Sequence, residues 1–355
     1  LVNTLTSGYW ANQAVVYGNY AYLGGDYGHY WIVDITDPRS PQTVSFPSLN
    51  DPGGTRYTTD LLIVNKTLVT AENDRGIRFR DLTSPRVPVR TGTVSTSHWA
   101  QRIRWHEGLL YVSDYYKGLR VVDMGNRRDP MPAARCAVGG SLWSGAGVGD
   151  ILLVTDYEQG LSVWDLSNPA APVSLEAAGI PGRFSEIVVN GTRALASGYD
   201  EGVVMFDVTQ PSAPARRGSV IISQVMYDAA MDGDIAYVAG GLGGLEVLDI
   251  ADLDQPKRLA ALPTPSSARS VARMGRYVFV GDFETGLLAY DCTDPSSPLL
   301  VGQCTLGAYP VDIVMKDTMA LVAADREGIL VVDCADPANP VLVHGFHPGG
   351  GTRTL

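Results

Sequence analysis

The sequence has few of the residues on which catalytic and metal sites usually depend. Its 355 residues include only 4 cysteines and 5 histidines. None of them shows the His-x-x-x-His or Cys-x-x-Cys spacing of a zinc site. The chain also has no Gly-x-Ser-x-Gly elbow, phosphate-binding loop or dinucleotide fingerprint. We therefore expect no metal and no cofactor, and no motif points to a particular reaction.

Long apolar runs and basic clusters are absent as well. No segment approaches the roughly 18 consecutive apolar residues of a membrane helix. The 27 Lys and Arg are outnumbered by 38 Asp and Glu, which gives a net charge of -11, and the basic residues are scattered singly. A nucleic-acid partner would need a basic stripe. We predict a soluble protein with no membrane span and no nucleic-acid partner.

What the chain does contain is an internal repeat. An Asp that ends an apolar run recurs eight times, first after 47 residues and then every 42. This motif Asp lies at Asp34, Asp81, Asp123, Asp165, Asp207, Asp249, Asp291 and Asp333. A Gly precedes it by five residues in seven copies, at Gly76, Gly118, Gly160, Gly202, Gly244, Gly286 and Gly328. A Pro follows it by seven in all eight, at Pro41, Pro88, Pro130, Pro172, Pro214, Pro256, Pro298 and Pro340.

Each repeat reads as four short strands. In the last copy, the apolar runs predict strands over residues 311–315, 319–323, 329–332 and 341–343. Gly328 permits the positive φ of a tight turn, and Asp333 can accept hydrogen bonds from the N–H groups of the turn that follows it. Pro340 then starts the outer strand, where a missing N–H donor does least harm.

The repeat predicts an all-β fold, an eight-bladed β-propeller of eight ~42-residue four-stranded units, with residues 1–355 as one domain. Four short strands cannot bury both of their faces alone, whereas units stacked about an axis bury every face. Helical repeats would need apolar residues at 3.6 spacing and would not tolerate the prolines. Residues 341–343 and 1–5 compete for the outer strand of the closing blade, and this choice stays open.

The four cysteines are expected to be free thiols. Cys136 and Cys304 occupy the same repeat position in blades far apart, and Cys292 and Cys334 follow the motif Asp. Equivalent positions in separate blades lie beyond the ~5.5 Å Cα separation of a disulfide. Buried thiols that act as small apolar groups are the expected outcome.

The sequence of the third strand and the turn after it resembles the repeat of a known family. Gly118-Leu-Arg-Val-Val-Asp123, and Gly328-Ile-Leu-Val-Val-Asp333 followed by Asp336-Pro337-Ala-Asn-Pro340, are similar to the LVIVD-repeat proteins. The resemblance implies a propeller-like scaffold and a place among extracellular, periplasmic or cell-surface proteins, and it carries no catalytic residues over to this chain. A chain that starts at Leu1 without Met fits a mature exported protein or a trimmed one. Departures at residues 78–80, 124–129 and 253–255 are expected to change turn detail only.

Candidate site residues come from comparing equivalent positions. The position 21 residues before the motif Asp is polar in every copy: Gln13, Asp60, Arg102, Ser144, Glu186, Asp228, Ser270 and Asp312. Aromatic residues gather just ahead of it, at Trp10, Tyr57, Trp99, Trp143, Phe184, Tyr227 and Tyr309. Others lie in the loop between the second and third strands, at Tyr27, Tyr115, Tyr116, Tyr157, Tyr199 and Phe283. In a propeller these two sets of loops open on the same face, around an axial funnel.

Two interpretations of this face stay open. Rings beside charged groups suit a small polar ligand, a glycan or a protein loop. Alternatively, the polar residues satisfy loop backbone groups and line a water-filled channel, while the rings wedge between blades. The motif Asp residues are expected to serve turns. Asp114, Asp156 and Asp282, with Glu72 beside them, could hold a hard cation, but solvated turn acids are favoured.

We predict a binding or interaction module. The candidate ligand-binding residues are Trp10, Tyr57, Asp60, Trp99, Arg102, Arg104, Trp143, Glu186, Tyr227, Asp228, Tyr309, Asp312, Tyr115, Tyr157 and Tyr199. The alternative is a lyase, isomerase or hydrolase in which Arg102 and Arg104 hold an anionic group. Its candidates for proton transfer are Glu186, Asp228 or Asp312, acting with His98 or a tyrosine. A purely structural surface protein is a third possibility, and the oligomeric state is left open.

Overall fold

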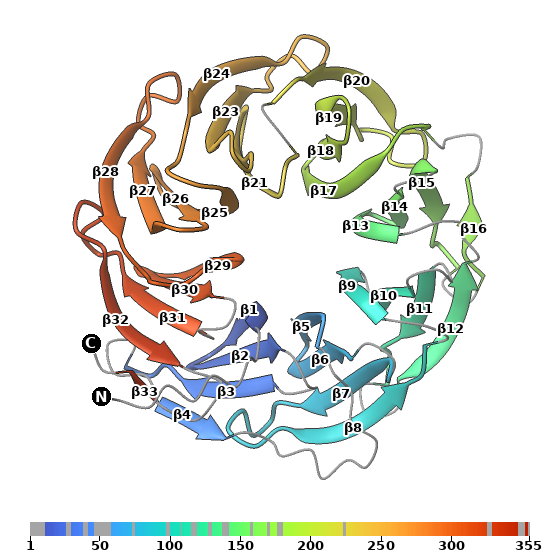
Figure 1. The fold of residues 1–355 in the computed structure, drawn as a ribbon. Coiled ribbons are helices and arrows are strands. Elements are labelled where there is room, and N and C mark those ends of the chain that lie inside the picture. Colours follow the sequence, from blue (N-terminus) through green and yellow to red (C-terminus); the bar gives the residue numbers. More distant parts are fainter. Residues whose placement is uncertain are drawn as a thin grey trace.

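The computed structural model is a closed ring of eight antiparallel sheets around a central axis (Figure 1). It describes residues 11–25, 30–37, 42–45, 58–72, 75–96, 100–106, 108–114, 119–126, 130–136, 142–156, 159–168, 171–175, 180–222, 225–324, 329–346 and 352–353. Each sheet is built from consecutive strands, so each sheet is one repeat. The all-β, eight-bladed prediction is confirmed. None of the described residues forms a helix that could cross a membrane.

The first two strands of each blade lie nearest the axis. The innermost strands are β1 (Ala11–Tyr17), β5 (Asp60–Val64), β9 (Ala100–His106), β13 (Leu142–Val148), β17 (Phe184–Asn190), β21 (Asp228–Asp232), β25 (Ala268–Met274) and β29 (Asp312–Lys316). The second strands are β2 (Tyr20–Gly25), β6 (Thr67–Ala71), β10 (Leu109–Asp114), β14 (Ile151–Asp156), β18 (Arg193–Gly198), β22 (Ile235–Ala239), β26 (Tyr277–Asp282) and β30 (Met319–Ala323).

The other two strands lie outward. The third strands, which end at the motif Asp, are β3 (Tyr30–Asp34), β7 (Ile77–Asp81), β11 (Leu119–Asp123), β15 (Gly160–Asp165), β19 (Gly202–Asp207), β23 (Leu245–Asp249), β27 (Gly286–Asp291) and β31 (Ile329–Asp333). The outer strands are β4 (Gln42–Ser45), β8 (Val89–Val94), β12 (Met131–Cys136), β16 (Val173–Ser174), β20 (Ala215–Val220), β24 (Lys257–Leu262), β28 (Leu299–Cys304) and β32 (Val341–Phe346). The four strands expected for the last copy are therefore present within one to three residues.

The hydrophobic core lies between blades. The buried apolar residues of the described chain form eight clusters, and each cluster joins two neighbouring blades. Between blades four and five, for example, Leu153 and Val163 pack with Phe184 and Phe206. The two phenylalanine rings meet edge to face at 5.7 Å. Because every cluster needs both of its blades, no blade buries its apolar faces alone.

The ring closes by the same kind of packing. β29 lies beside β1 (Figure 1), and Met319, Leu321 and Val331 share a buried cluster with Ala21 and Val33. The Lys316 ammonium donates a hydrogen bond to the Gly18 carbonyl at 2.9 Å. β32 is the outer strand of the closing blade, so the in-line segment takes this place. A short fifth strand, β33 (Thr352–Arg353), pairs outside it. Residues 1–5 lie outside the described part.

The motif residues fix the turns between strands. In all eight repeats, the motif Asp accepts the N–H of the residue two positions later at 2.6–3.0 Å. The expectation that these residues serve turns holds. At Asp207, the hydroxyl and N–H of Thr209 both donate to one carboxylate oxygen, and these bonds lower the pKa of Asp207. Each repeat therefore enters its outer strand at a defined angle.

The thiols are buried and free where the structure describes them. Cys292, Cys304 and Cys334 are not in disulfides. Burial raises the pKa of Cys292 and of Cys334 to about 12. The side chain of Cys136 lies outside the described part. These three cysteines behave as small apolar groups, as expected.

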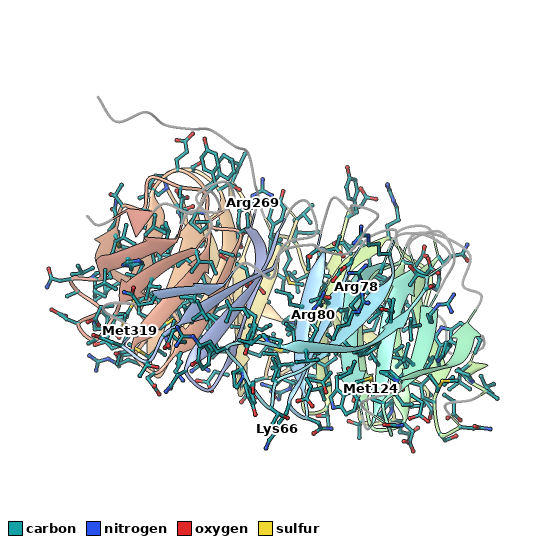
Figure 2. The ribbon with its side chains drawn as sticks, turned by 90° about the horizontal axis from the view of Figure 1, so that it is seen from below. Lys66, Arg78, Arg80, Met124, Arg269 and Met319 are labelled. Carbon is teal, nitrogen blue, oxygen red and sulfur yellow. The ribbon has the colours of Figure 1, made fainter. Side chains whose placement is uncertain are left out.

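The departure from the repeat motif at residues 78–80 was expected to change turn detail only, and this expectation is wrong. Arg78 and Arg80 lie on β7 and are buried (Figure 2). Their guanidiniums contact the Glu72 carboxylate at 3.0 and 2.8 Å, and Thr70 donates to the same carboxylate at 2.7 Å. A buried acid of this kind is tolerated only with charged partners. The arginines are therefore part of the blade interior.

The motif Gly is required for two reasons, which a pair of variants separates. Gly202 has φ +74°, and a Cβ there would lie 2.2 Å from the Val220 carbonyl oxygen. Gly191 has φ +60° but open space around it. We expect Gly191→Ala to lower the free energy of unfolding by about 1–2 kcal/mol, from backbone strain. Gly202→Ala should cost roughly 1–3 kcal/mol more, because the outer strand must move. Urea unfolding of both variants measures this, and equal losses would contradict it.

Candidate functional site

Aromatic rings and an arginine from three blades meet on one face. Tyr227 precedes β21, Phe283 follows β26 and Tyr309 lies ahead of β29. The rings of Phe283 and Tyr309 stack in parallel with centroids 4.0 Å apart. The Arg269 guanidinium lies 4.1 Å from the centre of the Tyr227 ring and 5.7 Å from that of Phe283. These four residues are named the Arg269 stack.

The face that bears the stack is named the funnel face. Figure 2 shows Arg269 on this face and Lys66 and Met124 on the opposite one. The stack combines residues that lead into innermost strands with a residue between second and third strands, so the two sets of loops converge there as the topology predicts. A second cation–ring pair comes from blade five, where the Arg183 guanidinium lies 4.5 Å from the Tyr199 ring centre. Its charge is met by Asp200 at 3.6 Å.

A β-bulge places Arg269 in the stack. Ala268 pairs with Asp282 and Ser270 with Gly281, so Arg269 is the extra residue between them. A bulged residue leaves the ladder and its side chain is redirected. Ala268 is fixed by two backbone hydrogen bonds to Gly241 in the preceding blade, at 2.9 and 3.0 Å. The Gly240–Gly244 segment is therefore a tight turn that also supports Arg269.

The eight polar residues 21 positions before the motif Asp, named the polar ring, lie near the starts of the innermost strands, and several of them join blades together. One oxygen of Asp60 accepts the N–H of Leu61 at 2.9 Å, and the other accepts the N–H of Ile103 in the next blade at 2.6 Å. Asp228 repeats this arrangement in blade six, with Ala229 at 2.8 Å and Val271 at 2.9 Å. These two members therefore satisfy backbone groups at blade boundaries.

Other members of the ring also bond across blades. The Ser144 hydroxyl donates to the Glu186 carboxylate of the following blade at 2.6 Å. Glu186 and Asp312 act electrostatically on Asp228. Burial, followed by the negative charges of Asp312 and Glu186, raises the pKa of Asp228 to about 7, against the two backbone N–H bonds that lower it. The axial mouth therefore holds a carboxyl group that ionises near neutral pH.

The acidic column between second and third strands is not solvated, which corrects our expectation. Asp114, Asp156, Asp282 and Glu72 are all at most 1% exposed. Asp282 accepts the N–H groups of Ser266 and Thr285 at 3.0 and 2.9 Å. Burial would raise its pKa, but the hydrogen bonds outweigh burial and the pKa is lowered. Asp156 likewise accepts the N–H of Gln159 at 2.8 Å, so these two acids hold hairpin turns from inside. Within the described residues, no group of three or more His, Cys, Asp or Glu is placed to hold a metal.

Several sequence candidates cannot be placed in this arrangement. Trp10, Tyr57, His98, Trp99, Tyr115 and Tyr157 lie outside the described residues. Arg102 and Arg104 are on β9 and Trp143 is on β13, and nothing is described of their side chains. The structure brings together Tyr227 and Tyr309 in the stack, and Glu186, Asp228 and Asp312 at the axis.

The sequence analysis missed Arg269 as a candidate. It stands one position ahead of the polar ring, the position that Trp143 and Tyr227 occupy in other blades. A cation among aromatic residues at one repeat position was the available signal.

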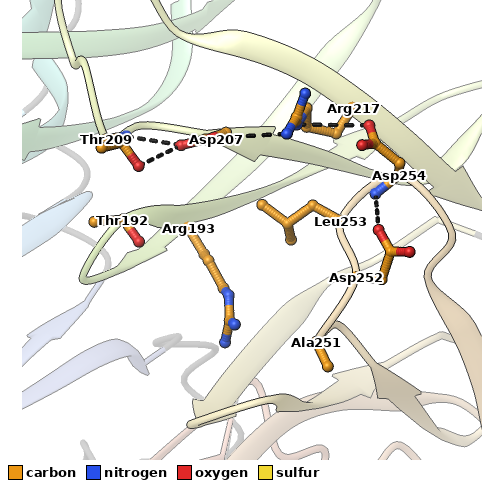
Figure 3. A pocket seen from close by; sticks show the side chains of 9 residues that line it. All are labelled: Thr192, Arg193, Asp207, Thr209, Arg217, Ala251, Asp252, Leu253 and Asp254. Atoms are coloured by element: carbon orange, nitrogen blue, oxygen red, sulfur yellow. Dashed lines mark hydrogen bonds and ion pairs between the residues drawn. The ribbon is translucent and has the colours of Figure 1, made fainter.

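The opposite face has clefts between blades, in which the motif Asp takes part. One, of about 320 Å³ between blades five and six, is lined by Arg193, Asp207, Arg217 and Asp254 (Figure 3). Arg217 contacts Asp254 at 3.5 Å and Asp207 at 3.8 Å. The equivalent cleft between blades two and three is about 480 Å³ and includes Asp81. In the cleft between blades five and six, Arg217 bridges carboxylates of two blades. Ion pairing within the chain therefore accounts for the charged residues that line this cleft.

The raised pKa of Asp228 predicts a pH dependence of stability. The folded state keeps this proton up to pH about 7, whereas the unfolded chain loses it near the ordinary value of 3.8. The contribution of this group is therefore complete below pH about 4 and is lost as pH rises to about 7. In Asp228→Asn, the free energy of unfolding should no longer fall between pH 4 and pH 7 because of this group. The wild type should lose up to roughly 4 kcal/mol more than the variant across that range.

Two measurements check the Asp228 prediction. Urea unfolding at pH 4 and pH 7 gives the slopes, and the Asn variant also loses one N–H acceptor, which lowers stability equally at both pH values. The NMR signal of the Asp228 carboxyl carbon should titrate with a midpoint of about 7. A midpoint near 4 would show that the two backbone N–H bonds outweigh burial.

Solved structures with similar folds include both designed and natural propellers. The computationally designed Ika8 protein gives a TM-score of 0.73 at 11% identity, covering 92% of this chain and 97% of that one. Sqt1 from Saccharomyces cerevisiae gives 0.72 at 8%, covering 86% and 90%. Chaetomium thermophilum Sqt1 bound to the N-terminus of the ribosomal protein L10 gives 0.73 at 14%, covering 91% and 96%. At these identities the likeness concerns the fold alone.

Curated proteins offer no match to the chain. The family model for the LVIVD repeat matches six segments that together make up more than half of the chain. They are residues 10–46, 99–137, 140–177, 227–258, 265–306 and 310–347. The segments between them contain the second and fifth blades, which the structure shows to be four-stranded sheets of the same strand order as the matched blades with four strands. This protein therefore belongs to the LVIVD repeat family.

Proposed function

We propose that this protein is a binding module that holds a segment of another protein on its funnel face. The Arg269 stack is the observation that supports this most directly. Tyr227 and Tyr309 remain 40% and 42% exposed although they are held in fixed positions by their stacking partners. Tyrosine and arginine in such settings are the residues that contribute most at protein interfaces. Chaetomium thermophilum Sqt1, which shares the fold, is bound to the N-terminus of another protein.

A protein segment fits this face better than a glycan or a small polar ligand does. Exposed aliphatic side chains accompany the rings: Ile221 at 66%, Leu242 at 62% and Val311 at 39%. They belong to the loops that open on the funnel face. In addition, Phe283 and Tyr309 cover each other, so their facing sides are not free to stack on a sugar ring. Edges of rings and aliphatic groups suit apolar side chains of a partner.

Acid–base catalysis is the second candidate, and the raised pKa of Asp228 is what favours it. Both oxygens of Asp228 already accept backbone N–H groups. Proton transfer at Asp228 would therefore disturb the contact between blades six and seven, and we favour binding. A location outside the cytoplasm stays a prediction, which rests on the family resemblance.

Peptide selection tests the proposed function. Twelve-residue random peptides displayed on phage would be selected on the purified full chain, and affinities of synthetic peptides measured by calorimetry. We expect Tyr309→Ala to weaken binding at least about tenfold, because an exposed anchor ring is lost. Leu299→Ala, which removes a 63% exposed side chain on the opposite face, is the control and should have no effect.

The same peptides discriminate binding from catalysis. Mass spectrometry after incubation should recover them unchanged, whereas cleavage or isomerisation that Asp228→Asn abolishes would favour an enzyme. Equal losses in Tyr309→Ala and Leu299→Ala would refute binding at the funnel face.

A further inference from the structure

Arg269 differs from the other arginines that stack on rings. Four arginines of the described chain lie over tyrosine rings: Arg183, Arg269, Arg273 and Arg276. Arg183 has Asp200 at 3.6 Å, Arg276 has Asp291 at 3.3 Å, and Arg273 bonds to Asp232. Among the residues that the structure describes, Arg269 has no carboxylate within ion-pair distance. Its Nε atom is buried and makes no hydrogen bond.

This lack of a partner is unexpected for the chain. With 38 acidic and 27 basic residues, the chain has more carboxylates than basic groups. The acids at neighbouring strand ends are engaged elsewhere. Asp228 accepts the N–H groups of Ala229 and Val271, and Asp282 those of Ser266 and Thr285. A buried donor without a partner costs free energy, so the fold retains a guanidinium that it does not neutralise.

The setting of Arg269 is suited to hold a planar anion. The bulge and the Gly241 bridge fix its backbone, and the Tyr227 ring covers one face of the guanidinium. Unlike Nε, the two Nη atoms are not buried, so their N–H groups form the open edge of the guanidinium plane. A guanidinium edge matches a carboxylate through two parallel hydrogen bonds. The contact with the Tyr227 ring lowers the side-chain entropy that Arg269 would lose on binding.

We infer that Arg269 binds a carboxylate of the partner segment, either an Asp or Glu side chain or the carboxylate that ends the chain. This inference rests on the proposed function and names the charged group that the funnel face selects. The tyrosine and phenylalanine rings of the stack then contact the residues next to that carboxylate. Partner segments without an acidic group are bound more weakly.

NMR of arginine side chains tests the inference without a known partner. In protein with ¹⁵N-labelled arginine, the Nε–H signal of Arg269 is assigned by its absence in Arg269→Lys. N-acetyl-glutamate α-amide offers a side-chain carboxylate, and N-acetyl-glycine a terminal one. We expect one or both to shift the Arg269 signal in a saturable manner, while the Arg276 signal stays in place. The same shift with sodium chloride at equal ionic strength, or no shift, overturns the inference.

Selected peptides provide the second test. We expect peptides that bind the wild type to carry an Asp, Glu or free C-terminus, and replacement of that group by Asn, Gln or an amide to lower affinity about tenfold or more. On Arg269→Gln the replacement should have no effect, and Arg269→Lys should restore part of it. Arg276→Gln is the matched control, because it removes a ring-stacked arginine from the opposite face.

The outcomes separate the two proposals. Peptides that bind through Tyr309 but show no acidic group, and bind Arg269→Gln as well as the wild type, overturn the carboxylate inference alone. If no peptide binds the funnel face, the proposed function fails, and the NMR titration still decides whether Arg269 takes a carboxylate.

Discussion

Every feature of this protein depends on the fact that a single blade cannot bury its own apolar faces. The eight core clusters each draw residues from two neighbouring blades, and the last of them joins blade eight to blade one. A blade at the end of an open stack would expose residues such as Leu321 and Val331, which are at most 1% exposed in the ring. Burial at about 25 cal/mol per Å² makes such exposure costly. Closure about an axis is the arrangement that leaves no blade at an end.

Closure brings the polar starts of the innermost strands together at the axis. Backbone N–H groups there need acceptors, which is the second requirement. Where blades three and seven carry a bulge, the N–H groups of Ile103 and Val271 point out of their own sheets. Asp60 and Asp228 accept these groups from the blades before them, in which the first and second strands pair without a bulge. Polar residues at this position therefore link neighbouring blades near the axis. The sequence shows only that the position is polar in every repeat, and does not show this role.

The sequence predicted those features that depend on residues close together in the chain, and missed those that depend on contacts formed only in the folded protein. The turn Gly, the motif Asp and the four strands depend on neighbours along the chain, so the period was enough to predict them. The buried acids at Asp156 and Asp282 were expected to be solvated, because the hairpin that encloses them forms only in the folded blade. The departure at Arg78 and Arg80 was expected to change turn detail only, since their partner Glu72 faces them only once the sheet is paired. The Arg269 stack spans blades six to eight, and no pattern within one repeat describes it.

Repetition also separates what maintains the fold from what can recognise a partner. A residue that recurs in every blade, such as the motif Asp, must serve something that every blade needs, and its turn bonds account for it. A residue that appears once must be explained by its own surroundings. For Arg78 the explanation lies in its own blade, where its guanidinium contacts the Glu72 carboxylate that Arg80 also contacts. For Arg269 it is incomplete within the described chain: rings hold the guanidinium in place, a glycine turn fixes its backbone, and its Nε lacks an acceptor. A charge that the fold positions but does not neutralise is better explained by a contact made outside the chain than by the stability of the ring.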